Sequence, residues 1–252
     1  QRLMEHLQAS FSEISSLLYV INQKKNDTLD GLEVQTFAGD GFITEQIGDL
    51  TFKVQPQSFF QTNTNQAKNL YDITKEFANL SGNELVYDLY TGTGSIAMYL
   101  AGKASKVLGV EYVQQAIDDA HENATLNSID NCVFYAGDLA KVLTTEFMEE
   151  NGKPEVIVTD PPRSGMHASV INKIIESEAE RIVYVSCNPG TQARDIEMLS
   201  DAYHLIKVQP VDMFPHTHHI ESVALLTRNK DYVAPVIEEY VPKHKRIAKE
   251  EE

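Results

Sequence analysis

The sequence predicts an α/β fold in which a mostly parallel sheet carries helices on both faces. From Thr64 onward, short apolar segments alternate with segments of helical periodicity, a pattern typical of successive βαβ units. Before that point lie short β-rich segments separated by Gly, Asp and Asn, which indicate a small antiparallel sheet. We therefore expect a partial β-rich subdomain over residues 1–56, an α/β domain over 57–230 and a charged tail over 231–252.

The N-terminal subdomain is expected to begin with a helix over residues 2–14. Four strands should follow and form one antiparallel sheet, from the segments SLLYVIN, LEVQTFAG, GFITEQIG and LTFKVQP. A second helix over NQAKNLYDITKEFANL should end at Ser81 and Gly82, because glycine is frequent just after a helix.

Five strands are expected in the alternating region, from ELVYDLY, KVLGVE, CVFYAG, EVIVTD and RIVYVS. The intervening helices should begin near Ser95, Val113, Leu139 and Ala168. A helix around TQARDIEML comes next, and the segments YHLIKVQPVDMF and ESVALLTR are expected to pair as a terminal antiparallel hairpin. Ligands of such sheets bind at the carboxyl ends of the strands, so functional residues are expected there.

Composition narrows the class of protein. The 252 residues are 42% hydrophobic and 23% charged, which is ordinary for a soluble globular protein. There is no apolar run long enough for a membrane span and no basic-then-apolar signal pattern, so we expect a cytoplasmic protein, and we expect a monomer. Two cysteines are too few for a disulfide framework. The net charge of −16 argues against nucleic-acid binding, which normally needs clustered Lys and Arg.

The first strand of the alternating region runs into a glycine loop, DLYTGTG, that begins at Asp88. Gly92 and Gly94 allow a tight turn and a close approach of the backbone to a ligand, although a turn without a ligand remains an alternative. Glu111 ends the next strand, where an acid can accept hydrogen bonds from ribose hydroxyls. Ala97 replaces the third glycine of the dinucleotide motif, and together with the acidic Asp88 this favours S-adenosylmethionine (SAM) over NAD.

Acidic residues also end the next two strands. Asp138 could contact an adenine, and it could equally serve as the N-cap of the helix that follows. Asp160 opens the segment DPPRSG, whose prolines make a stiff polar edge to the sheet. A simple turn is the alternative for this segment. Its combination with the glycine loop favours a substrate or cofactor pocket.

Cys187 ends the fifth strand on the same edge of the sheet and could be a nucleophile if its pKa falls. A small buried hydrophobe is the alternative, and Cys132, early in the third strand, fits that description. Glu221 begins an otherwise apolar strand, so its pKa should be raised, which suits a proton acceptor. Histidines 216, 218 and 219 invite a zinc site, but no supporting ligand spacing completes one, and we expect no metal.

Five separated motifs resemble, in order, those of the RNA uracil-5 methyltransferases, SAM-dependent enzymes that make 5-methyluridine. They are FFQTN at residues 59–63, the DxxxGxG loop, DPPRSG, YVSCNPGTQARD and MFPHTHHIESV. The resemblance covers roughly residues 50–228. It implies a Rossmann-like class I SAM-dependent methyltransferase fold, with residues 57–230 as the catalytic domain.

The resemblance also implies roles for individual residues. Cys187 would be the nucleophile that adds to uracil C6, and Glu221 would accept the C5 proton. Phe59 would stack near the target base, which must leave its helix or loop. The residues implied in SAM binding are Gln61, Tyr90, Glu111, Asp160, Asp138 as a weaker member, and the loop residues Asp88, Gly92 and Gly94.

An RNA substrate is therefore expected, with ribosomal RNA favoured and transfer RNA possible. Family members often carry an N-terminal RNA-binding barrel, and some carry four cysteines for an iron–sulfur cluster; this sequence has neither and begins inside what resembles the central subdomain. If RNA is gripped upstream, the acidity of this region is not contradictory. Tyr90 and Thr91 stand where relatives often have Phe and Cys. We expect this change to be tolerated, because the glycines determine the path of the backbone in the loop.

Two alternatives remain open. An amino-methyltransferase acting on an exocyclic nitrogen or a protein side chain also uses an Asp/Asn-Pro-Pro motif, but needs no cysteine or partnered glutamate. A non-catalytic SAM-fold module that binds RNA would need no reaction at all. Cys187 and Glu221 are the residues that distinguish these alternatives from uracil methylation.

Overall fold

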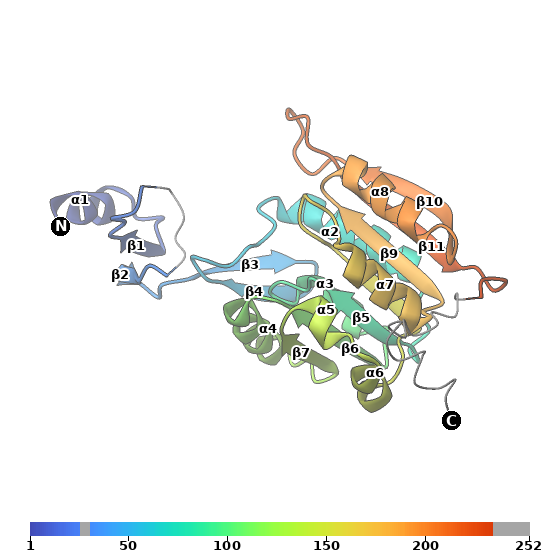
Figure 1. The fold of residues 1–252 in the computed structure, drawn as a ribbon. Coiled ribbons are helices and arrows are strands. Elements are labelled where there is room, and N and C mark those ends of the chain that lie inside the picture. The colour runs from blue at the N-terminus through green and yellow to red at the C-terminus, as the bar shows by residue number, and fades with distance from the viewer. Residues whose placement is uncertain (26–30, 234–252) are drawn as a thin grey trace, which may run out of the picture.

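The computed structural model describes residues 1–25 and 31–233, and the tail predicted over 231–252 lies almost entirely outside the described residues. The predicted α/β fold is confirmed (Figure 1): a seven-stranded sheet has the order β10-β11-β9-β8-β5-β6-β7. Its strands are β5 (Leu85–Leu89), β6 (Lys106–Glu111), β7 (Cys132–Ala136), β8 (Val156–Thr159), β9 (Arg181–Ser186), β10 (Tyr203–Val211) and β11 (Glu221–Arg228).

The central strands β5 to β9 pair in parallel, as expected from their helical crossovers. β11 pairs antiparallel with both β9 and β10, which confirms the terminal hairpin. Because β11 runs in the opposite direction, its first residue lies at the edge of the sheet where the parallel strands end. This reversal brings Glu221 to the same edge as Cys187.

Helices cover both faces of the sheet, and alternate strand residues point to opposite faces. Val86 packs in the core beside α2, α3 and α4, whereas its neighbour Tyr87 packs in the core on the other face, beside the remaining helices. The helices are α2 (Thr64–Ala78), α3 (Ser95–Ala101), α4 (Gln114–Leu126), α5 (Leu139–Val142), α6 (Thr145–Asn151), α7 (Ala168–Ser177) and α8 (Pro189–Leu199).

Three expectations about helices need correction. The helix expected over residues 2–14 ends at Ser10. The helix expected to end at Ser81 and Gly82 ends at Ala78, because Asn79 adopts a left-handed conformation with φ 45°. The single helix expected from Leu139 is divided into α5 and α6, since Thr144 begins a new helix by accepting a hydrogen bond from the Phe147 amide. In the described part of the chain, no helix is long and apolar enough to cross a membrane.

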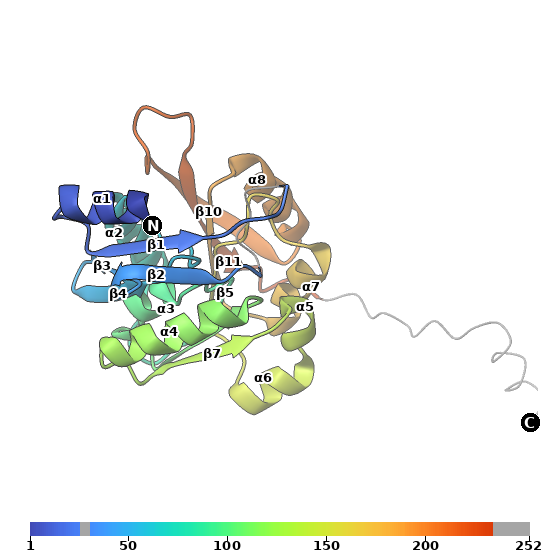
Figure 2. The ribbon, with the colours of Figure 1, turned by 90° about the vertical axis from the view of Figure 1, so that its left-hand side faces the viewer.

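The N-terminal strands do not form the single sheet that was predicted. They form two separate two-stranded sheets (Figures 1 and 2): in Figure 1 the second pair lies next to the α/β domain, whereas the first pair lies farther out with the N-terminal helix. The chain turns sharply between the two pairs at Gly39 and Gly41, both with φ near 80°. The elements are α1 (Arg2–Ser10), β1 (Ser16–Val20), β2 (Val34–Gly39), β3 (Ile43–Ile47) and β4 (Leu50–Val54).

Asn123 of α4 and Asn127, the residue just after α4, explain why β4 takes no further strand. Asn127 accepts a hydrogen bond from the Thr51 amide at 2.9 Å and donates to the Thr51 carbonyl at 2.7 Å. Asn123, which is buried, makes the same pair of contacts with Lys53, at 2.8 and 3.3 Å. Side-chain amides therefore satisfy the outer edge of β4 and fix the β3–β4 hairpin to the α/β domain.

Candidate active site

A cavity of about 600 Å³ lies at the carboxyl ends of the parallel strands. This volume is typical of sites for small molecules and cofactors. Most of the residues singled out from the sequence line it: Phe59, Gln61, Asp88, Tyr90, Gly92, Glu111, Asp160, Cys187 and Glu221. The two prolines of DPPRSG line it as well, and so do residues that sequence reasoning did not single out, among them Tyr71, Tyr112 and Arg163.

Asp88 lies at the floor of the cavity and is almost completely buried. Its Oδ2 accepts hydrogen bonds from Thr91 Oγ1 at 2.6 Å and from the Ala97 amide at 3.1 Å, whereas its Oδ1 has no partner. Burial raises the pKa of Asp88 to about 7. A buried, unpartnered carboxylate oxygen at a cavity wall is suited to a cationic or hydrogen-bond-donating ligand.

The glycine loop turns between β5 and α3 as the sequence indicated. Gly92 has φ 55°, and a Cβ built there would meet nothing within 4 Å, so the backbone borders open space. Glu111 accepts hydrogen bonds from the amides of Gly92 at 3.3 Å and Val113 at 3.0 Å, which holds its carboxylate at the cavity wall. Tyr90 also has positive φ, 61°, which is strained for an aromatic residue and is found most often at functional sites.

Two residues predicted to bind the cofactor do not line this cavity. At Gly94 a Cβ would meet the Phe134 ring at 2.8 Å, so the glycine is required there by packing. Asp138 accepts a hydrogen bond from the Ala140 amide at 3.1 Å and caps α5. It lines a neighbouring cavity that shares Tyr90 and Tyr112 with the main one.

Cys187, Glu221 and Asp160 all line the main cavity, and the pairing of β9 with β11 brings Cys187 and Glu221 close together. Burial raises the pKa of Glu221, while the Arg163 guanidinium partly opposes this shift. Burial raises the pKa of Asp160 as well, with a further contribution from the charges of Glu221 and Asp88. The pKa of Cys187 is raised by burial and by Glu221, whereas Arg163 favours the thiolate through a hydrogen bond and its positive charge.

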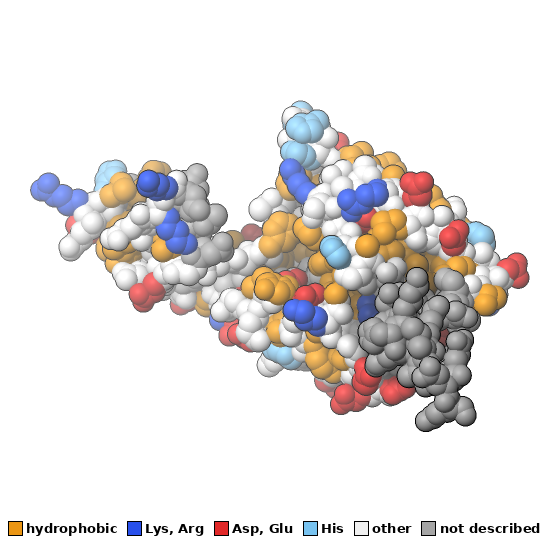
Figure 3. All heavy atoms as spheres, viewed as in Figure 1, with side chains coloured by type: hydrophobic (Ala, Val, Ile, Leu, Met, Phe, Trp, Pro, Cys, Tyr) orange, Lys and Arg blue, Asp and Glu red, His pale blue; other side chains and the backbone are white. Residues whose placement is uncertain are grey.

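Arg163 is the one cationic side chain among the described residues that line the cavity. It belongs to the DPPRSG segment, from which the direction of its side chain could not be predicted. Its Nη2 donates to His219 Nδ1 at 3.4 Å. In Figure 3, histidine side chains gather on the protruding loop between β10 and β11, next to this edge of the sheet.

Phe59 is 76% exposed at the cavity mouth, and the loop that carries it is anchored at both ends. The Ser58 hydroxyl donates to the buried Asp119 carboxylate of α4. Asn63 Nδ2 donates to the Met213 carbonyl at 2.9 Å, and Asn63 Oδ1 caps α2 through the Gln66 amide. The loop therefore presents an aromatic ring to solvent on a fixed backbone.

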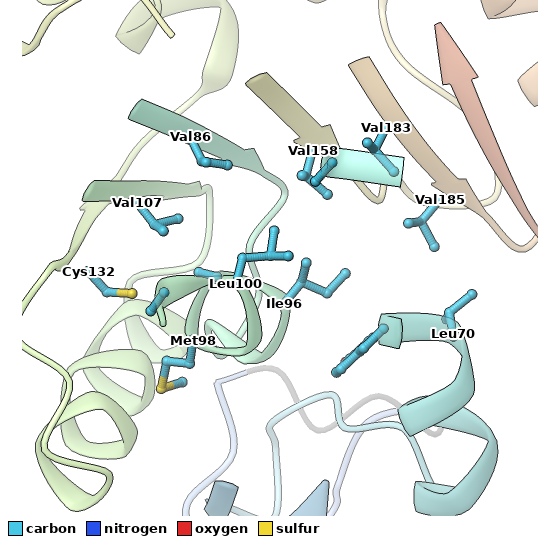
Figure 4. Close-up of a cluster of buried hydrophobic side chains, with 14 of the residues drawn as sticks. Leu70, Val86, Ile96, Met98, Leu100, Val107, Cys132, Val158, Val183 and Val185 are labelled. Carbon is cyan, nitrogen blue, oxygen red and sulfur yellow. The ribbon is translucent and has the colours of Figure 1, made fainter. Parts of the chain in front are cut away.

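Cys132 lies in the core, among the apolar side chains between the sheet and α3 (Figure 4). Burial raises the pKa of its thiol to about 12, which makes it unreactive, as the sequence indicated. Among the described residues, no group of three or more His, Cys, Asp and Glu side chains could hold a metal ion.

Comparisons with known proteins agree with the geometry of this edge. A family model described as tRNA (uracil-5-)-methyltransferase matches residues 41–229. An uncharacterized RNA methyltransferase of Bacteroides thetaiotaomicron is 55% identical over 226 residues, which are 90% of this chain and 50% of that protein. One of Porphyromonas gingivalis is 53% identical over 233 residues, 92% of this chain and 50% of that protein. The chain thus spans about half the length of these relatives.

A solved structure is also similar: the tRNA (uracil-54, C5)-methyltransferase of Pyrococcus abyssi in complex with S-adenosyl-L-homocysteine. It has a TM-score of 0.76 and 33% sequence identity, and the match covers 88% of this chain and 53% of that one. The residues matched by the family model include every strand of the seven-stranded sheet and every residue that lines the cavity.

Proposed function

Because this chain belongs to the tRNA (uracil-5-)-methyltransferase family, we propose that it methylates C5 of uracil in RNA, with SAM as the methyl donor. The observation that carries the proposal is that Cys187 and Glu221 lie close together in the lining of a cofactor-sized cavity. An amino-methyltransferase would need neither residue. A cytoplasmic, monomeric enzyme remains the expectation.

The residues of the cavity fit SAM. SAM carries a cationic sulfonium and an ammonium group, and the wall of the cavity contains the carboxyl groups of Asp88, Glu111 and Asp160. The unpartnered Oδ1 of Asp88 is available to a donor, and the open space beside Gly92 admits a ligand close to the backbone. We propose that Gln61 and Tyr90 complete the binding residues, with Asp138 acting from the neighbouring cavity.

The cofactor would supply an electrophilic methyl group. Uracil C5 is a weak nucleophile, and in the proposed reaction the Cys187 thiolate adds to C6, so that the C5–C6 π electrons make C5 carbanion-like. C5 then forms a bond to the methyl group, and the bond from that group to the sulfonium sulfur would break with its electron pair left on sulfur. Glu221 removes the C5 proton, the resulting electron pair restores the C5–C6 double bond, and the C6–sulfur bond breaks to release Cys187.

The charges of the cavity support these roles. Glu221 has a raised pKa because it is partly buried, and a raised pKa brings a carboxylate closer to the value that suits a general base. The Cys187 thiol has a raised pKa in the free protein, so its reactivity depends on the opposing effect of Arg163. Exposed Phe59 at the mouth of the cavity could stack on the uracil or on a neighbouring base after the uridine leaves its helix or loop.

The proposal also names the class of RNA that is methylated. Ribosomal RNA is the expected substrate and transfer RNA the alternative. The net charge of −16 predicts weak affinity of this region for RNA, so most of the binding energy should come from elsewhere in the whole protein.

The test uses the full-length gene product, SAM with an isotopically labelled methyl group, and separate ribosomal and transfer RNA from cells that lack the gene. Nucleoside mass spectrometry should find labelled 5-methyluridine in one of the two pools. Label found only on an exocyclic nitrogen or on protein would support an amino-methyltransferase instead. Binding of both SAM and RNA without any transfer of label would support a non-catalytic module.

A further inference from the structure

The residues that follow Cys187, in the segment NPGTQARD, line no part of the main cavity and have no role in the chemistry proposed above. They form the first turns of α8. Asn188 is the N-cap of this helix, and its Oδ1 accepts a hydrogen bond from the Gly190 amide at 3.1 Å. Pro189 occupies the first helical position, where a missing amide donor has no consequence.

The same turn holds the backbone of the segment that carries Arg163. Asn188 Nδ2 donates to the Arg163 carbonyl at 3.0 Å, and Thr191 Oγ1 donates to the same carbonyl at 3.2 Å. The single Thr191 hydroxyl hydrogen is also within reach of the Asn188 carbonyl at 3.1 Å, so the Arg163 carbonyl receives the hydrogen bond of Asn188 and shares that of Thr191.

Two further side chains of α8 extend these contacts along the segment. Arg194 Nη2 donates to the Ser164 carbonyl at 3.0 Å and to the Met166 carbonyl at 3.3 Å. The buried Asp195 accepts from the Met166 amide at 2.7 Å. A Cβ at Gly165 would meet Arg194 Nη2 at 2.5 Å, so the two segments are in close contact.

These contacts couple the cation of the cavity to the thiol. Arg163 follows β8 and Cys187 follows β9, and the hydrogen bonds from α8 add to the pairing of these two strands in holding the exposed Arg163 backbone relative to the cysteine. The guanidinium is the group that favours the thiolate, so a shift of its backbone changes thiol reactivity.

We propose that Asn188 and Thr191 are positioning residues that hold Arg163 beside Cys187 and thereby keep the thiol reactive. The role of Cys187 as the nucleophile rests on the proposed function. The coupling itself is tested by thiol chemistry without RNA or SAM, so its failure is distinguishable from a failure of the proposed function.

The experiment measures the rate of iodoacetamide alkylation of the 252-residue chain from pH 6.5 to 9.5, with mass spectrometry of the Cys187 peptide. Buried Cys132 serves as an internal reference for global opening. Thr191→Val removes the donor with little change in shape, and should slow alkylation near neutral pH by about three- to tenfold, the effect of one hydrogen bond. Its rate profile should move to higher pH. Thr191→Ser keeps the hydroxyl and should retain the native profile.

A double-mutant cycle distinguishes positioning from a purely structural effect. Arg163→Gln should itself slow alkylation, and adding Thr191→Val to it should slow alkylation no further, since the group being positioned is already absent. Equal slowing by Thr191→Val in the native and Arg163→Gln backgrounds would overturn the proposal. A native alkylation profile for Thr191→Val, with Cys132 still protected, would overturn it as well.

Asn188→Ser tests the other side chain that donates a hydrogen bond to the Arg163 carbonyl. Serine retains an N-cap oxygen but lacks the reach of the asparagine amide, so this variant should also slow alkylation of Cys187. Thermal unfolding of each variant identifies any that fails to fold. If Thr191→Val does not fold, a native profile for folded Asn188→Ser contradicts the proposal.

Discussion

Cys187 and Glu221 each stand one residue beyond the last antiparallel pair of β9 and β11, in which Ser186 faces Ser222. The strand pairing therefore sets the thiol and the carboxylate side by side at the rim of the cavity, although they are far apart in the sequence. Their proximity also explains why Glu221 contributes to the raised pKa of Cys187.

Replacing Cys187 with Ala should reduce 5-methyluridine formation by at least about a thousandfold, because no other group can add to C6. SAM binding, measured by calorimetry, should be retained, since the carboxylates of the cavity are unchanged. Cys132→Ala is the matched control and should retain methylation, because Cys132 lies in the core. Turnover by the Cys187→Ala variant would favour an amino-methyltransferase.

Replacing Glu221 with Gln should stop the reaction after methyl transfer, since an amide cannot take the C5 proton. Protein joined covalently to methylated RNA should accumulate and be visible by mass spectrometry after denaturation. Glu180→Gln, at the opposite end of β9, is the control and should give no such adduct. Rapid turnover without an adduct in the Glu221→Gln variant would indicate another base.

Asp88 should make folding stability depend on pH. Its pKa is about 7 in the folded protein and near 4 when unfolded, so the folded state binds more protons between these values. The contribution of Asp88 to the free energy of unfolding is therefore most favourable below pH 4 and becomes less favourable as pH rises to 7, by up to about 4 kcal/mol. Urea unfolding at pH 5 and pH 8 should show a smaller difference in Asp88→Asn than in the native chain. An equal difference in both would contradict the assigned cause.

Much of the fold could be predicted because its signals are local. The strands of the parallel sheet and the starts of α3, α4 and α7 follow from periodicity and turn residues, and the rule that ligands bind at strand ends indicated one common edge. The pairing of the N-terminal strands could not be predicted, because the asparagines that occupy the edge of β4 lie in α4 and just after it, about seventy positions later.

The residues of the candidate site could likewise be predicted only in part from the sequence. Cys187 and Glu221 could be selected from their places at strand ends, and resemblance gave them roles that remain to be tested. The backbone of Arg163 is held by hydrogen bonds from α8, and its side chain contacts His219, neither of which a pattern in DPPRSG indicates. The unpartnered oxygen of Asp88 likewise depends on which neighbours reach it after folding.

The most direct test of the central claim is to mix the full-length protein and SAM with substrate RNA that contains 5-fluorouridine at the methylated position. Fluorine leaves no C5 proton for Glu221 to remove, so Cys187 should remain bonded to C6 of a methylated base, and mass spectrometry should find that adduct on the Cys187 peptide. If SAM and RNA both bind and the peptide carries no adduct, the covalent mechanism is contradicted.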